Sequence, residues 1–316
     1  MTLTVNGREV LDSSALETHY EPRRPVDLAS TLGQHRRGAG DPCFVVEGGA
    51  HWLTLRTPAG TATLRLSPTS SGVRAVAWGD GAGEALHTVP ELLGDGDDWS
   101  ALDVSAHPLL ADSARRNQGL RLSRTGRVLD ALAPAVIEQR ITSAEAFRAW
   151  RVLVARHGEP APGPGPDRLR VSPTASAWKR IPSWEWHRAG VDPGRAATVI
   201  RAAGVAAGLE RTAIASRGGA DVWRRLRSVV GVGEWTAAET AQRAHGDPDA
   251  VSFGDYHLAS TMGWALCGEP IDDDALAELL EPWRGQRQRV VRLVLSSGFR
   301  PPRRGPRMTI QDHRAY

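Results

Sequence analysis

The chain has 316 residues, 41% of them hydrophobic and 24% charged, which is the composition of an ordinary globular protein large enough for two domains. It has no run of about 18 apolar residues and no basic segment followed by an apolar one at its start, so we expect neither a membrane span nor a signal peptide. Its two cysteines, Cys43 and Cys267, exclude a disulfide framework and a four-cysteine cluster, which favours the reducing cytoplasm.

The first hundred residues are rich in short segments of the β type. Apolar or alternating runs at 43–47, 51–56, 61–66 and 73–78 are separated by turns that contain Gly and Pro. This pattern predicts an antiparallel sheet. Residues 79–98, rich in Gly and Asp, are expected to form a loop around one short helix.

From about residue 101 the spacing of apolar residues becomes helical. The pattern predicts helices over 108–115, 128–139, 143–157, 193–209, 220–229 and 234–244, and two more after Pro270 that divide near Pro282. Ser143 is the expected N-cap of the helix over 143–157, and Asp192 is the expected N-cap of the helix over 193–209. Residues 158–166, GEPAPGPGP, have the composition of a Pro/Gly linker.

Charge is unevenly distributed along the chain. Residues 269–281 hold six acidic residues and no base, whereas residues 284–307 hold eight arginines and no acid. The basic tract is interpreted either as a solvated surface followed by a flexible tail or as the footprint of a nucleic acid. Lys179 is the only lysine, so only one side chain could form a Schiff base.

The most informative segment is residues 229–258, VVGVGEWTAAETAQRAHGDPDAVSFGDYHL. A tight turn at 231–233, Gly-Val-Gly, lies between two helical patterns, and such a turn exposes backbone N–H groups that can bind a phosphate. The alternative is a plain connection between helices, because Gly-x-Gly by itself only marks a turn. The first of these helices is expected to present one apolar stripe, formed by Val222, Trp223, Leu226, Val229 and Val230.

Asp255 follows Trp235 by twenty residues. A carboxylate at this distance beyond the turn could face the sugar of a nucleotide whose phosphate the turn holds. The alternative is a loop aspartate that caps the helix beginning near Tyr256. For His257, the sequence favours the interpretation as a surface or capping histidine over the interpretation as a general base.

Residues 229–258 resemble the helix-hairpin-helix DNA glycosylase superfamily in their hairpin, loop and aspartate. Within it, the chain is most similar to the bacterial inducible 3-methyladenine DNA glycosylases, which also carry Trp at the Trp235 position. The segment at 193–196, Pro-Gly-Arg-Ala, also resembles a family segment that enters a helix. The likeness is strong over 229–258 and weak over most of 100–300.

The resemblance implies an α+β fold. An N-terminal antiparallel β-sheet domain over 1–103 would precede an all-α helix-hairpin-helix glycosylase domain over 104–299 and a basic C-terminal tail over 300–316. The resemblance also implies that Asp255 is the catalytic residue, with Na⁺ or K⁺ on the hairpin carbonyls and no metal held by side chains. The implied phosphate-binding residues are Gly231, Val232, Gly233, Glu234 and Thr236.

The sequence departs from the family at three positions. Val230 stands where the family hairpin has Pro, and Arg292 stands near the place of an aromatic that stacks on the base. Arg140 lies where the family inserts an apolar wedge into the duplex, so Gln139 and Arg140 are the wedge candidates.

Eleven of the eighteen aromatic residues are tryptophan. An electron-rich aromatic pocket attracts a cationic base, and the pocket candidates are Trp184, Trp186, Trp235 and Tyr256. Packing in the core is the alternative for each tryptophan.

The resulting hypothesis is a monofunctional DNA glycosylase of base excision repair that acts on alkylated purines of the 3-methyladenine type. The enzyme would flip out its nucleotide, and Asp255 would stabilise the oxocarbenium-like transition state and orient water. Trp235 occupies the place of the lysine that bifunctional members use, so no lysine-based lyase activity is expected.

The expected partner is double-stranded DNA that contains damaged bases. We expect the protein to act as a monomer in the cytoplasm, at the nucleoid, and not at a membrane. No iron–sulfur cluster is expected. The alternative function is a non-catalytic binder of damaged or bent DNA that uses the same hairpin. A third class is a protein-interaction module built on the β domain.

Overall fold

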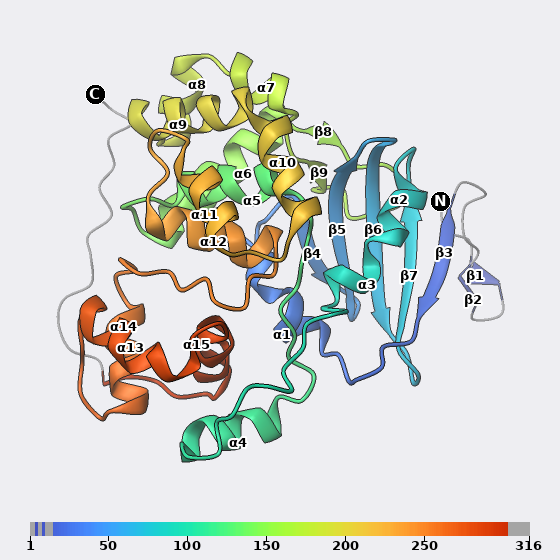
Figure 1. Cartoon of the computed structure of the whole chain (residues 1–316). Helices are drawn as coiled ribbons and strands as arrows, with labels where there is room; N and C mark the ends of the chain where they lie inside the picture. Colours follow the sequence, from blue (N-terminus) through green and yellow to red (C-terminus); the bar gives the residue numbers. More distant parts are fainter. Residues whose placement is uncertain (1–3, 6–7, 10–14, 303–316) are drawn as a thin grey trace.

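A five-stranded antiparallel sheet forms one side of the protein, as a computed structural model of residues 4–5, 8–9 and 15–302 shows (Figure 1). Its strands lie in the order β3-β7-β6-β5-β4. They are β3 (Leu16–Tyr20), β4 (Phe44–Glu47), β5 (Ala50–Thr57), β6 (Gly60–Pro68) and β7 (Val73–Trp78), and a separate short pair joins β1 (Thr4–Val5) to β2 (Arg8–Glu9). The predicted antiparallel sheet is confirmed. The edge strand β3 was not expected, because four of its five side chains are exposed and leave no apolar alternation.

Short helices cover one face of this sheet. They are α1 (Leu28–Leu32), the 3-10 turn η1 (Gly33–His35), α2 (Ala82–His87) and α3 (Val89–Leu92). Leu32, Ala85 and Leu92 pack with Leu64 and Leu66 of β6 in one buried cluster. Two helices, α2 and α3, therefore stand where one was expected.

The central helical body packs around α5 (Val128–Ile137), in which nine of ten residues are buried. Its other helices are α6 (Ser143–His157), α7 (Ala175–Arg180), α8 (Ser183–Ala189), α9 (Pro193–Gly204), α10 (Ala206–Ala215), α11 (Ala220–Arg227) and α12 (Glu234–Ala244). Helices α6, α9, α10 and α12 all contact α5. The hairpin that joins α11 to α12 therefore rests on the core of the body.

Two local predictions in this body are wrong. The N-cap of α6 is Thr142, not Ser143, because Thr142 and Glu145 exchange hydrogen bonds in a capping box. The single helix expected over 193–209 breaks at Val205 into α9 and α10. Asp192 is confirmed as the N-cap of α9, since its side chain accepts from the N–H groups of Gly194 and Arg195.

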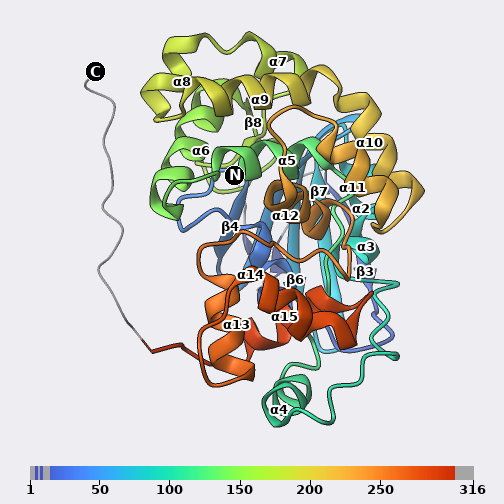
Figure 2. The same cartoon turned by 60° about the vertical axis from the view of Figure 1, so that its left-hand side comes forward.

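A third hydrophobic cluster joins residues from two distant parts of the chain (Figure 2). The helices are α4 (Pro108–Arg116), α13 (Leu258–Leu266), α14 (Asp273–Leu280), the 3-10 turn η2 (Glu281–Trp283) and α15 (Arg287–Ser296). The buried Ser113 hydroxyl of α4 donates to the Leu293 carbonyl of α15 at 2.7 Å. This cluster lies beside the helical body, and the segment between α12 and α13 connects the two.

The Pro/Gly segment at 158–166 is packed rather than free. β8 (Glu159–Pro160) pairs with β9 (Arg170–Val171), and a Cβ at Gly163 would lie 2.4 Å from Cγ of Trp78 in the sheet. The predicted boundaries at 103/104 and 299/300 stay predictions, and most of the expected tail lies outside the described residues. None of the helices over 15–302 is long and apolar enough to cross a membrane.

Candidate active site

The turn between α11 and α12 requires glycine at one position for two reasons. Gly231 has φ of +98°, a conformation that side chains disfavour. A Cβ there would also lie 2.1 Å from Oγ1 of Thr198, so the turn is pressed against α9. Gly233, in contrast, has a negative φ and open space around it, and it is the N-cap of α12.

The N-terminal end of α12 is open to solvent. No side chain caps this helix, and Gly233 and Glu234 are exposed, so the first N–H groups of α12 are left for solvent or a ligand. The expected apolar stripe of α11 is buried at Val222, Leu226 and Val229, but Val230 is 69% exposed. Val230 points outward because it already belongs to the turn.

The hairpin carbonyls already accept hydrogen bonds. The Val229 carbonyl accepts from the Val232 N–H, the Val230 carbonyl from Arg201 at 3.3 Å, and the Gly231 carbonyl from Gln139 at 3.0 Å. Each carbonyl oxygen keeps a second lone pair, so the proposed monovalent cation stays a prediction. No group of three His, Cys, Asp or Glu side chains in the described part of the chain could hold a metal ion.

Asp255 points at the helix that follows the hairpin. Its Oδ2 accepts from the Trp235 indole N–H at 3.2 Å, and Trp235 lies in the first turn of α12. Its Oδ1 accepts from the N–H groups of His257 and Leu258 at 2.9 and 3.0 Å, at the start of α13. Asp255 thus anchors the start of α13, whose N-cap is His257, and these two bonds also hold its second oxygen beside the hairpin helix.

Gln139 and Arg140 lie directly after α5, next to the hairpin. The Gln139 amide donates to the Gly231 carbonyl and, at 2.7 Å, to the hydroxyl of the buried Thr236. Gln139 therefore braces the turn. Arg140 is exposed and has φ of +58°, the only positive φ outside glycine among the described residues. Because Arg140 is exposed and its backbone is strained, it remains our wedge candidate.

The aromatic candidates divide between core and surface. Trp186 is 2% exposed and stacks on Trp178 with ring centroids 5.7 Å apart, so it packs the core and offers no face to a base. We therefore remove Trp186 from the proposed pocket. Trp184 and Tyr256 are 65% and 78% exposed, and Trp235 contacts Asp255. Only Trp235 is placed by a hydrogen bond to the candidate catalytic group.

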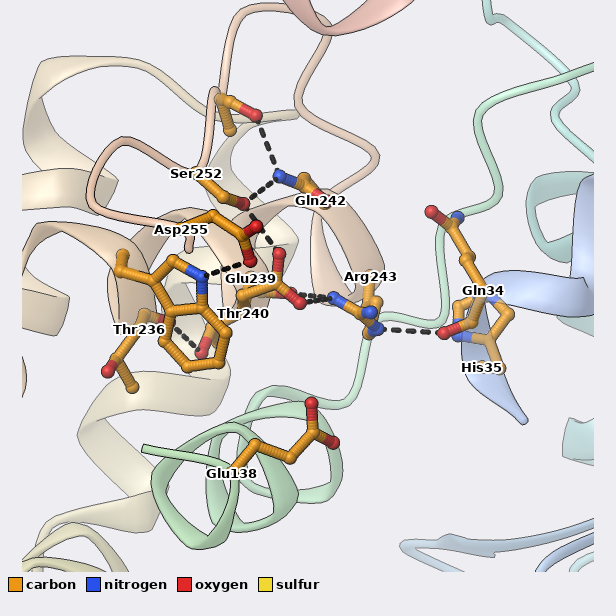
Figure 3. Close-up of polar contacts among 12 residues, drawn as sticks. Gln34, His35, Glu138, Thr236, Glu239, Thr240, Gln242, Arg243, Ser252 and Asp255 are labelled. Atoms are coloured by element: carbon orange, nitrogen blue, oxygen red, sulfur yellow. Dashed lines mark hydrogen bonds and ion pairs between the residues drawn. The ribbon is translucent and has the colours of Figure 1, made fainter. Parts of the chain in front are cut away.

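A group of charged side chains gathers around Arg243, and the sequence analysis named only one of them, Arg292; Figure 3 draws Glu138, Glu239 and Arg243. We call it the charged wall, and its members are Arg37, Glu138, Glu239, Arg243 and Arg292. Glu239 accepts from Arg243 at 2.6 Å and from the Ser252 hydroxyl at 2.5 Å, while Arg37 pairs with Glu138 at 2.6 Å. These residues come from four separate segments. Only Glu239 and Arg243 lie within residues 229–258, and their spacing there is also typical of a solvent-exposed helix face.

Two members of the charged wall, Glu239 and Arg243, lie on the same face of α12 as Trp235. Glu239 follows Trp235 by four residues, one helical turn, and Ser252 precedes Asp255 by three. The Glu239 and Arg243 side chains are each 14% exposed, so this pair is mostly buried. Arg243 extends to the Gln34 carbonyl at 2.9 Å, and Arg292 reaches the Ser30 carbonyl at 2.6 Å, which ties the wall to the β domain.

The protonation states follow from burial and from these neighbours. Burial opposes ionisation of Glu239, but Arg243 and Ser252 outweigh it and lower its pKa, so the carboxylate is charged. Burial lowers the pKa of Arg292 to about 10, with Arg243 adding to the effect. Burial, followed by nearby Arg243 and Arg37, also holds the pKa of His35 well below 6.5, so His35 is neutral at pH 7.

Three arginines of the basic tract form ion pairs with acidic residues of the same chain. Arg284 pairs with Glu281, Arg287 with Asp249, and Arg289 with the buried Asp97. Part of the basic tract therefore neutralises acidic residues of the same chain. A role of Arg303, Arg304 and Arg307 in DNA binding falls outside the described residues.

This arrangement of a glycine hairpin, an uncapped helix and a following aspartate defines the helix-hairpin-helix glycosylase fold. The chain has the fold of helix-hairpin-helix DNA glycosylases and is similar in sequence to a DNA repair enzyme. A comparison with models of known protein families finds no match.

Two curated relatives carry the name probable bifunctional transcriptional activator/DNA repair enzyme AlkA, from two strains of Mycobacterium tuberculosis. Each is 28% identical over 277 residues, which cover 83% of this chain and 53% of the relative. The chain thus spans about half the length of these relatives.

Solved structures share the fold over almost their whole length. The 3-methyladenine DNA glycosylase of Archaeoglobus fulgidus has a TM-score of 0.70 at 17% identity, covering 90% of this chain and 98% of that one. The apo-form of the 8-oxoguanine glycosylase/lyase of Clostridium acetobutylicum has a TM-score of 0.68 at 11% identity, covering 92% and 98%. At such identities the likeness establishes the fold.

Proposed function

We propose that the protein is a monofunctional DNA glycosylase of base excision repair that removes damaged purines from double-stranded DNA. The observation that carries this proposal is the position of Asp255, whose Oδ2 lies 3.2 Å from the Trp235 indole nitrogen. The open N–H groups at the start of α12 are suited to a DNA phosphate. A phosphate held there would bring its sugar towards Asp255.

The mechanism follows from the placement of that carboxylate. The C1′–N bond of the flipped nucleotide breaks, its electron pair leaves with the base, and positive charge develops on the sugar. Asp255 would stabilise this charge and orient the water that attacks C1′. Because Oδ1 is held by two backbone N–H groups, the carboxylate is fixed before substrate binds.

The monofunctional assignment rests on the absence of a suitable amine. Trp235 stands in the first turn of α12, and Lys179, the only lysine, is exposed on α7. A Schiff base with the sugar needs an amine at the site. The resemblance to inducible 3-methyladenine glycosylases supports alkylated purines as substrates, and we propose that the enzyme acts as a monomer at the nucleoid.

The test is release of bases from damaged duplex DNA by wild type and Asp255→Asn. Asn keeps an acceptor for the two N–H groups at the start of α13, so the variant should fold and bind DNA, but base release should fall about 100- to 1,000-fold, the loss typical of removing one transition-state contact. Asp27→Asn is the matched control, because Asp27 accepts from a backbone N–H as the N-cap of α1, beside the sheet.

Equal release by Asp255→Asn and wild type would remove the catalytic assignment. The alternative function, a non-catalytic binder of damaged or bent DNA, predicts tight binding of such duplexes by wild type with no base released from any lesion.

A further inference from the structure

The segment over 250–255, which carries Asp255, is attached along one face of α12 (Figure 3). Trp235 and Gln242 lie about two helical turns apart on this face. The Gln242 amide donates to the Ala250 carbonyl at 2.9 Å, and the Trp235 indole N–H donates to the Asp255 carboxylate at 3.2 Å. The segment therefore runs back along α12, from the end of the helix towards its first turn.

Ser252 lies in the middle of this attachment. Its hydroxyl accepts from the Gln242 amide at 2.8 Å and donates to the Glu239 carboxylate at 2.5 Å. Glu239 is charged, and an ionised carboxylate can only accept, so the one hydroxyl proton of Ser252 points to Glu239. The lone pairs of the hydroxyl are then left for Gln242. The side chain of Ser252 is thus fixed from two sides.

Ser252 is also the last buried residue before Asp255. Ser252 is 5% exposed, whereas Gly254 and Tyr256, on either side of Asp255, are exposed. The Ser252 carbonyl accepts from the Asp255 N–H at 3.2 Å, which closes a turn between the two residues. The position of the Asp255 backbone therefore depends on how Ser252 is held.

The attachment of Ser252 continues to the β domain. Arg243 donates to the Glu239 carboxylate at 2.6 Å and, through Nε, to the Gln34 carbonyl at 2.9 Å. Gln34 belongs to the turn η1, which follows α1. Four successive hydrogen bonds thus lead from η1 through Arg243, Glu239 and Ser252 to the backbone of Asp255.

We propose that Ser252 is a positioning residue for Asp255. Glu239 and Gln242 hold Ser252, and Arg243 anchors this arrangement to the β domain. The inference rests on the proposed catalytic role of Asp255. A displacement of a reacting group by about 1 Å can cost about 100-fold in rate. Both side-chain partners of Ser252 lie beyond the first turn of α12, so the hairpin that is proposed to hold the phosphate keeps its own contacts.

The experiment compares Ser252→Ala with wild type under single turnover. The probes are methylated duplex DNA, from which 3-methyladenine and 7-methylguanine are scored, and a duplex that contains hypoxanthine. Base release by Ser252→Ala should fall about 10- to 100-fold, because its loop no longer holds the carboxylate in one place. The Kd for a duplex with a stable abasic-site analogue should stay within about twofold of wild type, since a positioning residue acts on the reaction and not on binding.

Hydrogen exchange gives a second measurement that does not depend on activity. Exchange of the backbone amides over 253–258, followed by mass spectrometry, should be at least about tenfold faster in Ser252→Ala, because the segment loses its buried attachment. Exchange in α5 should be unchanged. A lowered rate of base release with unchanged exchange over 253–258 would overturn the inference.

The matched control is Ser113→Ala. Ser113 is buried in α4, and its hydroxyl also donates one hydrogen bond, to the Leu293 carbonyl, and accepts one, from the Asn117 amide. This variant should lose stability as Ser252→Ala does and should keep the wild-type rate of base release. An equal loss of rate in both variants would assign Ser252 a merely structural role.

Gln242→Met serves as the second variant if Ser252→Ala does not fold. It removes the amide that holds Ser252 and keeps a flexible side chain of similar length in α12. Base release should fall about tenfold at unchanged Kd. A wild-type rate in this variant would contradict the positioning role.

Arg243→Lys tests the anchor on the β domain. Lysine keeps a positive charge beside Glu239, but its single nitrogen does not span both the Glu239 carboxylate and the Gln34 carbonyl. Base release should fall about threefold or more at unchanged Kd. Arg156→Lys is the control, because Arg156 pairs with the buried Glu185 on α8, and it should keep the wild-type rate. A wild-type rate in Arg243→Lys would overturn the role of the β domain.

Two further outcomes separate this inference from the proposed function. Base release that depends on Asp255 but is unaffected by Ser252→Ala would overturn the positioning role and leave the glycosylase intact. Release of no base by wild type would overturn both.

Discussion

The hairpin and the charged wall both involve α12, yet they differ in what they leave open to a ligand. The hairpin presents backbone N–H groups that no side chain caps, which suits a phosphate in DNA of any sequence. The charged wall holds its side chains in ion pairs and hydrogen bonds within the protein. The hairpin is thus open to a ligand, whereas Arg243 and Arg292 of the wall join the helices to the Gln34 and Ser30 carbonyls.

The hairpin tolerates little change at Gly231. Gly231→Ala should destabilise the protein by about 3 to 4 kcal/mol, because it combines a left-handed backbone with overlap on Thr198. Chemical denaturation would measure the loss, and DNA binding should weaken as the turn shifts.

Gly233→Ala is the control for this prediction, because Gly233 has a negative φ and open space. Its stability should stay within about 0.5 kcal/mol of wild type. The double variant that combines Thr198→Ala with Gly231→Ala should recover only the part of the lost stability that comes from overlap with the Thr198 side chain. Equal stability of the two alanine variants at 231 and 233 would refute the account of the turn.

The far end of α12, beyond the wall, should make the protein sensitive to acid. His245 is fully buried against Thr212, and burial, with Arg124 adding to it, lowers its pKa from 6.5 to about 4. The folded protein therefore keeps His245 neutral, so its stability is complete above pH 6.5 and falls as the pH drops towards 4. Between pH 7 and pH 4.5 the loss from this group is about 2 kcal/mol.

Thermal unfolding against pH would check this expectation with His245→Gln. Between pH 7 and pH 4.5 the free energy of unfolding of that variant should fall by about 2 kcal/mol less than that of wild type. His187→Gln, at an exposed position, should respond to pH as wild type does. An identical acid response in all three proteins would show that His245 is not the sensitive group.

The smallest expected effect concerns the brace between α5 and the hairpin. Gln139→Ala removes hydrogen bonds to the Gly231 carbonyl and the Thr236 hydroxyl and should cost about 1 kcal/mol in stability. DNA affinity should fall, because the turn that is proposed to hold the phosphate loses its brace. Gln118→Ala, at an exposed position, is the control. Unchanged DNA affinity in Gln139→Ala would show that this brace does not support the hairpin.

Prediction from sequence succeeded where neighbours along the chain also interact in space. The strands β4 to β7 and the N-cap Asp192 could be predicted because alternation and capping are local. Ser143 was chosen as a cap where Thr142 serves, since adjacent hydroxyl residues differ only in the backbone each adopts. Trp186 was placed in the pocket because a tryptophan in the core and one at a site have the same local pattern.

By itself, the sequence determined the β-rich start, the helical remainder, the tight glycine turn and an aspartate twenty residues after Trp235, because each depends on short-range spacing and backbone preference. The tertiary structure alone decided that Asp255 faces Trp235, that Gln139 braces the turn and that Arg37, Glu138 and Arg292 gather beside Glu239. Such gathering depends on how the three hydrophobic clusters pack against one another, and packing brings together residues that no periodicity relates.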